Sequence, residues 1–115
     1  ERGDVVVVKY PGDPEHKRYV KRVIGMPNEV ITVQTGGVFI NNKRLAESYF
    51  EQTVVTDKDG SWKLGKDEYF LMGDNRPNSN DSRYFGPVEK RFIIGKTVWI
   101  LLPRFFSVTT PTYTL

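Results

Sequence analysis

The stretch from residue 73 to residue 88, GDNRPNSNDSRYFGPV, concentrates side chains that can donate, accept or transfer protons. It holds two Asp, three Asn, two Ser and two Arg directly after the apolar run YFLM, which is more hydrogen-bonding capacity than a surface turn needs. Such a segment either folds back on itself as a polar network or lines a site. Ser79 and Ser82 are nucleophiles in principle, but neither lies in a G-x-S-x-G elbow, and turn capping is the alternative role for both.

A second segment that could do chemistry surrounds Lys21, in the run YVKRVIGMP at residues 19–27. In a strand, alternation places Lys21 on the same face as Tyr19 and Val23, while Val20 and Arg22 point the other way. A lysine in an apolar cleft loses hydration of its charged form, so its pKa falls from about 10.4. The neutral amine is then a general base that can activate a serine hydroxyl. The alternative is a lysine that extends from the strand edge into water.

Arg22 predicts a carboxylate partner, because two cationic side chains cannot both sit easily in one apolar strand. Asp74, Asp81 and Glu29 are the candidates, and a bidentate arginine–aspartate pair would tie the strand to the polar segment. Asp81 and Arg83 lie two residues apart and could pair with each other. For each of these pairs, the alternative is an ordinary surface ion pair worth about 0–1 kcal/mol.

Composition limits the possible functions. The 115 residues suit one domain, and 38% hydrophobic with 27% charged residues indicates a folded globular chain. Cysteine is absent and the single His16 has no paired ligands nearby, so no metal centre is expected. The net charge of +3 is mild, and the aromatic pairs at 84–85 and 105–106 lack strongly basic surroundings, which disfavours a nucleic-acid-binding small barrel. No apolar run reaches the roughly eighteen residues of a membrane span.

The elements that must position these residues are short strands. Alternating or β-branched runs separated by Gly, Pro, Asn and Asp turns predict strands at residues 5–10, 18–24, 30–33, 38–40, 43–45, 69–72 and 93–102. Residues 46–66 are less regular, with a loop or short helical turn at 46–52, and the tail at 103–115 is expected to fray or run extended. No amphipathic helix of ten or more residues is visible. The fold class is therefore mostly β, with antiparallel strands curling into a barrel-like sheet.

Three segments together resemble the type I signal peptidases, serine proteases with a Ser–Lys dyad. YVKRVIGMPNE is similar to the lysine box of that family, and GDNRPNSNDSRYFGPV to its C-terminal GDN…S.DSR..G box. RGDVVV at residues 2–7 resembles the short box that opens the catalytic sheet. The boxes occur in the family's order across residues 2–88. One departure is Pro27-Asn28-Glu29, where the family often has Pro-Gly-Asp.

The resemblance implies a role for each matching residue. Lys21 would be the general base, and Ser79 would hydrogen-bond its amine and orient it. Tyr19 and Val20 would lie on the strand that pairs with an extended substrate, and Val20 would also line the small pocket for the residue before the cleaved bond.

The same resemblance implies two bracing ion pairs, Arg22 with Asp74 and Asp81 with Arg83. The chain would form a single catalytic domain over residues 1–115. Large bacterial members insert a second β-domain between the two boxes, whereas the interval here is short, so we expect a reduced cap at about residues 41–68.

The family's nucleophile box, a serine-containing S-M-x-P segment, is absent from the sequence. The resemblance therefore implies that the nucleophile and a membrane anchor lie upstream of Glu1 and that the 115 residues are inactive alone. The intact protein would remove signal peptides from exported preproteins at the extracytoplasmic face of the cytoplasmic membrane, without metal or organic cofactor, while this piece would be soluble. The alternative is a non-catalytic peptide-binding or assembly module, although the presence of both Lys21 and Ser79 favours the enzyme.

Overall fold

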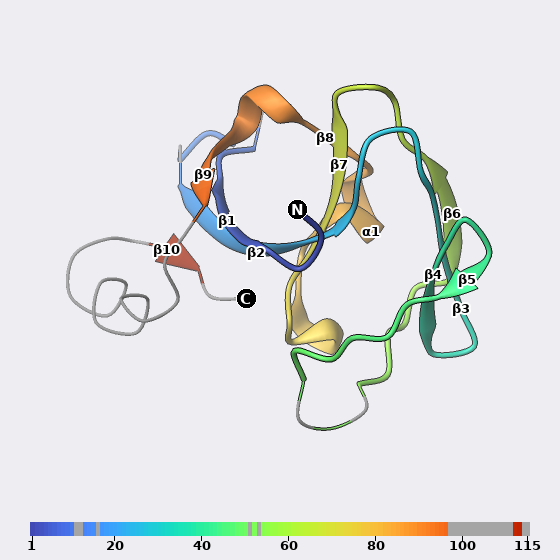
Figure 1. Ribbon diagram of the computed structural model, residues 1–115. Helices are drawn as coiled ribbons and strands as arrows, with labels where there is room; N and C mark the ends of the chain where they lie inside the picture. Colours follow the sequence, from blue (N-terminus) through green and yellow to red (C-terminus); the bar gives the residue numbers. More distant parts are fainter. Residues whose placement is uncertain (11–12, 16, 51, 53, 97–111, 114–115) are drawn as a thin grey trace.

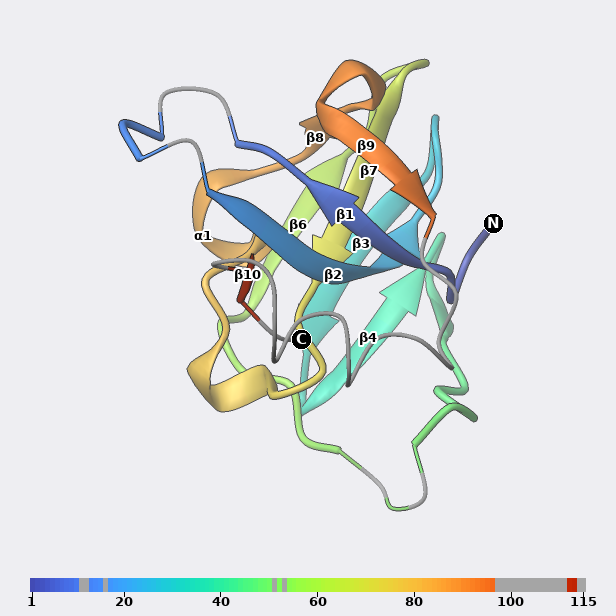
Figure 2. The same cartoon turned by 90° about the vertical axis from the view of Figure 1, so that its left-hand side faces the viewer.

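Short antiparallel strands dominate the computed structural model, which describes residues 1–10, 13–15, 17–50, 52, 54–96 and 112–113. The strands form two sheets, seen from two sides in Figures 1 and 2. The first sheet contains β1 (Val5–Val8), β2 (Arg18–Gly25), β7 (Glu68–Met72), β8 (Val88–Glu89), β9 (Ile93–Lys96) and β10 (Thr112–Tyr113). The second contains β3 (Val30–Gln34), β4 (Gly37–Ile40), β5 (Lys43–Arg44) and β6 (Gly60–Lys63). The predicted mostly-β class is confirmed.

The first sheet is open. Its strand order is β8-β7-β2-β1-β9, and no pairing among the described residues joins β8 to β9, so the predicted barrel-like sheet is not a closed barrel. The valine run of β1 pairs antiparallel with β2, and this places Val6 opposite Lys21 and Val8 opposite Tyr19. The predicted hairpin between these two strands is confirmed.

The second edge of β2 is divided between two strands. Met72 of β7 pairs antiparallel with Arg22. Beyond that point β10 pairs parallel with β2, with Thr112 opposite Arg18 and Tyr113 opposite Tyr19. The predicted strand at 93–102 is described only as β9, and most of the 103–115 tail lies outside the described residues.

Strands β3, β4 and β5 of the second sheet form a meander, as predicted, and β6 pairs with the other edge of β3. Asn41 and Asn42 adopt positive φ angles of 49° and 71° in the turn between β4 and β5, a conformation that asparagine tolerates. β6 was not predicted, because its sequence GSWK is short and has no apolar alternation beyond one tryptophan. Tertiary packing of Trp62 stabilises this strand, because the centroid of its ring lies 4.7 Å from that of Phe70.

A core lies on each face of the first sheet. On β2, Ile24 belongs to the cluster shared with the second sheet, whereas Val23 faces the cluster of Val6 and Leu71. The crossing with the second sheet is tight at Gly25, where an added Cβ would lie 2.5 Å from Ile31 Cδ1. Val20 and Lys21 point to opposite faces of β2 and are both buried, so the strand is covered on both faces at this position and a side chain there has no short path to water. This packing decides the environment of Lys21.

Two short helical turns follow β7. The 3-10 turn η1 (Arg76–Asn78) and the one-turn helix α1 (Ser82–Phe85) shape the polar segment after Met72, and η2 (Lys90–Phe92) connects β8 to β9. Residues 46–50 form an irregular loop with a turn, so of the two predicted forms the loop is the one observed. No helix in the described part of the chain is both long and apolar enough to cross a bilayer.

Candidate active site

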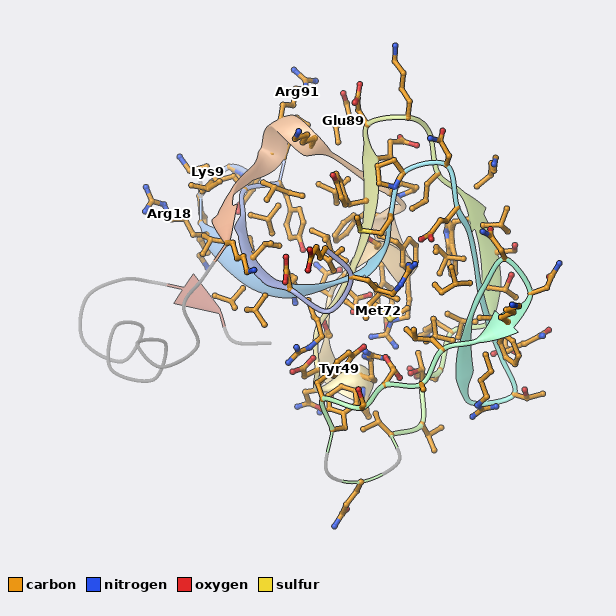
Figure 3. All side chains as sticks on the ribbon, in the orientation of Figure 1. Lys9, Arg18, Tyr49, Met72, Glu89 and Arg91 are labelled. Carbon is orange, nitrogen blue, oxygen red and sulfur yellow. The ribbon has the colours of Figure 1, made fainter. Side chains whose placement is uncertain are left out.

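Lys21 and Ser79 meet in the interior although 58 positions separate them in the sequence. The Lys21 Nζ donates a hydrogen bond of 3.0 Å to Ser79 Oγ. Only 3% of Lys21 and 6% of Ser79 is exposed to solvent. Basic side chains on or next to the strands of the first sheet, including Lys9, Arg18 and Arg91, are exposed and extend outward (Figure 3). Lys21 is therefore a buried amine and does not reach from the strand edge into water.

Burial lowers the pKa of the Lys21 amine from its ordinary value of 10.5. The removal of water from around the ammonium is the main cause, because the charged form loses its hydration. The Asp81 carboxylate opposes this by raising the pKa, and the nearby Arg83 guanidinium lowers it further. Compared with water, the environment therefore destabilises the charged form of the amine relative to the neutral form, and the neutral form can accept a proton.

Ser79 is held from two sides. Its Oγ also accepts a hydrogen bond of 3.1 Å from the Gly73 backbone N–H, where β7 ends. The same N–H donates to Asp81 Oδ2 at 3.1 Å. The serine hydroxyl thus sits at a fixed place between the end of β7 and the Lys21 amine.

Asp81 organises the loop after β7. The carboxylate has no exposed surface and caps α1 by accepting the Arg83 N–H at 3.1 Å. It also accepts two bonds of 2.9 Å from the Arg83 guanidinium. Ser82 Oγ ties the helix back to β7 by accepting the Leu71 N–H at 2.9 Å. The polar segment therefore folds into a network and also supplies the Ser79 partner of Lys21, so it combines the two outcomes that the sequence left as alternatives.

Arg22 pairs with Asp74, one of its three candidate partners. Its Nε and Nη2 donate to the two carboxylate oxygens at 2.8 and 2.7 Å, a bidentate pair that joins β2 to the polar loop. Glu29 instead pairs with Arg2, at 2.6 and 2.8 Å. The bracing pairs of Arg22 with Asp74 and of Arg83 with Asp81 are both present in the structure.

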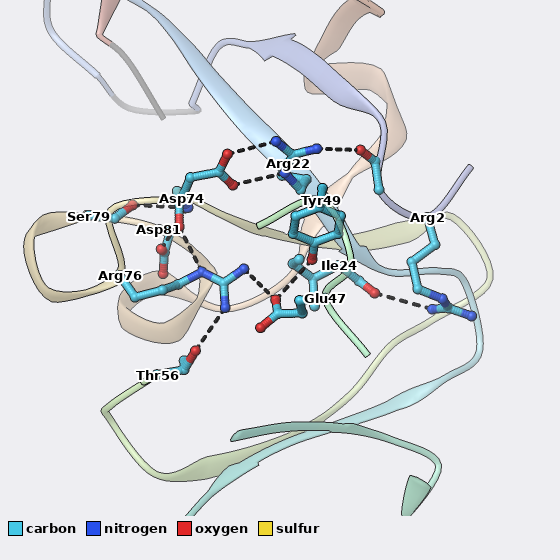
Figure 4. A network of polar contacts seen from close by, with 12 residues as sticks. Arg2, Arg22, Ile24, Glu47, Tyr49, Thr56, Asp74, Arg76, Ser79 and Asp81 are labelled. Atoms are coloured by element: carbon cyan, nitrogen blue, oxygen red, sulfur yellow. Dashed lines mark hydrogen bonds and ion pairs between the residues drawn. The ribbon is translucent and has the colours of Figure 1, made fainter. Parts of the chain in front are cut away.

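Arg76 is a residue that the sequence did not single out. It has no exposed surface, and its guanidinium donates to the Gly73 carbonyl and Thr56 Oγ1 at 2.8 Å each and to Glu47 Oε1 at 2.6 Å (Figure 4). Both side-chain partners lie in the irregular stretch 46–66, where no periodic pattern marks a residue as buried. The one available signal was that Arg76 lies inside the polar segment.

Tyr19 and Val20 lie beside the buried pair. Val20 is buried, whereas Tyr19 is partly exposed and packs its ring 4.8 Å from that of Tyr10. A pocket of about 540 Å³ adjoins Tyr19 and is lined in part by Asn80, the neighbour of Ser79. The β2 edge at Tyr19 is covered by Tyr113 of β10.

An antiparallel β fold with a buried lysine–serine pair is the arrangement expected of a signal-peptidase core, and comparisons with known proteins agree. The family described as "Signal peptidase, peptidase S26" matches residues 1–102. The chain therefore belongs to this family, which confirms the resemblance found in its three sequence boxes.

Similar proteins include Signal peptidase I P of Bacillus subtilis subsp. natto, 37% identical over 90% of this chain and 60% of that protein. Signal peptidase I of Pseudomonas fluorescens is 34% identical over 90% of this chain and 50% of its own length. The crystal structure of a signal peptidase I from Enterococcus faecalis V583 superposes with a TM-score of 0.72 at 29% identity, over 85% of this chain and 96% of that one. This chain spans 50 to 60% of the two curated relatives.

Proposed function

We propose that this chain supplies the lysine half of a Ser–Lys signal peptidase, an endopeptidase that removes signal peptides from exported preproteins. The observation that carries the proposal is the hydrogen bond between the buried Lys21 amine and Ser79. Family membership supports it, because the relatives are named signal peptidase I. The chain covers only part of those relatives, so the reaction of the whole protein is inferred.

In the proposed mechanism, neutral Lys21 takes the proton of a serine hydroxyl as that oxygen attacks the carbonyl carbon of the cleaved bond. The ammonium that forms is stabilised by the Asp81 charge and by the acceptor oxygen of Ser79. Protonated Lys21 can then return the proton to the leaving amine. Ser79 orients the amine and is not the nucleophile in this scheme, because Lys21 and Gly73 both donate to its oxygen.

The sequence holds no S-M-x-P segment, so the proposal assigns the nucleophilic serine to a segment outside these 115 residues. We expect the isolated chain to bind peptides without cleaving them. In the intact protein we place the site at the extracytoplasmic face of the cytoplasmic membrane. The chain would be one catalytic domain, with about residues 41–68 as its reduced cap.

The proposed substrate is an extended peptide that adds to the β2 edge beside Tyr19 and Val20. β10 shows that this edge accepts a parallel strand, since Thr112 and Tyr113 pair there. A peptide would have to replace β10. Binding assays should therefore compare the full chain with a chain that ends at Pro111.

The test is a direct titration of Lys21 by NMR of chain labelled with ¹³C at the lysine side chains, with the exposed lysines as internal references. We expect Lys21 to titrate below those references. Ser79→Ala should lower the Lys21 pKa further, since the hydroxyl accepts a bond from the ammonium.

Ser61→Ala is the matched control, because this hydroxyl bonds Thr32 on the exposed face of the second sheet and should leave the titration of Lys21 unchanged. A Lys21 amine that titrates with the exposed lysines would overturn the assignment of a general base. A depressed pKa together with no Lys21-dependent cleavage by the full-length protein would instead favour the peptide-binding module.

A further inference from the structure

We propose that Glu47 and Tyr49, in the loop between β5 and β6, are positioning residues that hold the two halves of the Lys21–Ser79 pair in register. This inference rests on the proposed function, in which Lys21 takes the proton and Ser79 orients its amine. It assigns a catalytic purpose to a loop that the sequence marked only as irregular. Figure 4 shows the residues that carry it.

The first contact fixes the half of the site that carries Ser79. Glu47 Oε1 accepts a bond of 2.6 Å from Arg76, whose Nε donates to the Gly73 carbonyl at 2.8 Å. The N–H of the same glycine donates to Ser79 Oγ. Arg76 also supplies its carbonyl to the Arg83 guanidinium at 2.7 Å. A shift of Glu47 is therefore transmitted through Arg76 to the backbone that holds the serine.

The second contact fixes the half that carries Lys21. The Tyr49 ring lies under the guanidinium of Arg22, with 4.1 Å between the Arg22 Cζ and the ring centroid. Arg22 is the neighbour of Lys21 on β2, and it is also bound by Asp74. Tyr49 thus packs against β2 directly beside the position of the catalytic base.

One oxygen joins the two contacts. The Tyr49 hydroxyl donates to Glu47 Oε1 at 2.9 Å, the same atom that accepts from Arg76. Glu47 is also the one carboxylate paired with Arg76 among the residues that the structure describes. The side chain is largely buried, so water can replace these bonds only if the loop moves. The loop therefore bridges β2 and the polar segment at a single acceptor.

Among the residues that the structure describes, Asp81 and Arg83 are the charged groups that shift the Lys21 pKa, and Glu47 is not one of them. A substitution at Glu47 should therefore affect the Lys21 pKa through the packing and hydration around the amine, and not through a direct charge interaction. When the bridge is lost, we expect water to enter between β2 and the polar loop. The Lys21 pKa should then rise toward its ordinary value, because hydration returns to the charged form.

The experiment compares the Lys21 titration in Glu47→Ala and Glu47→Gln. Both variants lose the same negative charge, but glutamine keeps an acceptor oxygen for Arg76 and Tyr49. We expect about a tenfold smaller neutral fraction of Lys21 at a fixed pH in Glu47→Ala, corresponding to one pKa unit, and most of the neutral fraction restored in Glu47→Gln. Glu89→Ala is the control, because it removes a carboxylate from an exposed pair with Arg91.

Three outcomes separate the possibilities. If Lys21 of the unmodified chain titrates normally, the proposed function fails. If the Lys21 pKa is depressed in the unmodified chain and equally depressed in folded Glu47→Ala, the positioning role fails and Glu47 contributes to stability alone. If Glu47→Ala does not fold, the Lys21 titration in Tyr49→Phe is the deciding test. This variant keeps the ring against Arg22 and removes only the hydrogen bond to Glu47. An unchanged titration in both Tyr49→Phe and Glu47→Gln, with Glu47→Ala unfolded, would also refute the positioning role.

Discussion

Replacement of Asp81 by asparagine tests whether the network around the polar loop holds the site together. Each carboxylate oxygen accepts two bonds: Oδ1 from the Arg83 N–H and Nε, and Oδ2 from the Gly73 N–H and Arg83 Nη2. In either orientation, the asparagine NH₂ would face two donors. The variant therefore loses two hydrogen bonds as well as the countercharge of a buried guanidinium.

The expected loss of unfolding free energy is about 3–5 kcal/mol, the usual result of removing one partner of a buried ion pair. That is a large part of the roughly 5–15 kcal/mol that stabilises a domain. Asp57→Asn is the matched control, because Asp57 bonds the same guanidinium at 3.0 Å but its side chain is 54% exposed. Loss of that pair should reduce stability by about 0–1 kcal/mol.

Urea unfolding followed by tryptophan fluorescence gives both values by linear extrapolation. Trp62 packs against Phe70 and reports loss of the core between the sheets. A cost below about 1 kcal/mol for Asp81→Asn, or one equal to that of Asp57→Asn, would refute the reasoning. The same variant should lower the Lys21 pKa further, since the Asp81 charge raises it in the native chain.

Two further predictions concern β2. Because the Lys21 pKa is lower in the folded than in the unfolded chain, the folded chain binds fewer protons between the two values, and the free energy of unfolding should rise with pH toward about 10.5. Lys21→Met should remove this rise. Near neutral pH the variant should be more stable than the native chain, by about 1.4 kcal/mol for each unit by which the fold lowers the Lys21 pKa. Urea unfolding at several pH values measures this, and an equal pH dependence of the unfolding free energy in the two chains would contradict it. Gly25→Ala should destabilise the fold by about 1–3 kcal/mol, since the new methyl group would lie 2.5 Å from Ile31 Cδ1 and 2.9 Å from Phe70 Cβ. Thermal unfolding measures this, with Gly95→Ala, which meets nothing within 4 Å, as the control, and equal melting temperatures would show that the crossing is not tight.

Local patterns predicted the strands that carry the site. The β-branched run at residues 5–8, the turn formers after it and the apolar residues among 19–24 predict the β1–β2 hairpin without reference to the rest of the chain. The polar composition after Met72 marked Ser79, Asp81 and Arg83 as residues of one segment. The spacing of residues two apart also allowed the pair between Asp81 and Arg83, which needs no distant partner.

Partners that are distant in the sequence were harder to predict. Three carboxylates were open as partners of Arg22, and the choice of Asp74 depends on how the loop returns from β7 to β2. The sequence places Arg76 in the polar segment but does not indicate its burial against Glu47, because charged residues of both types are usually found at the surface. β6 likewise exists because Trp62 packs on Phe70, a contact between segments of different sheets.

The sequence by itself determined the β class of this protein, its family and the segments that contain Lys21 and Ser79, since periodicity and motif spacing are properties of neighbouring residues. Only the tertiary structure decided that the amine is buried and not solvated, because that depends on β1, β7 and the polar loop closing around β2. The pKa of an amine is set by the water and charges around it, and those surroundings come from residues far away along the chain.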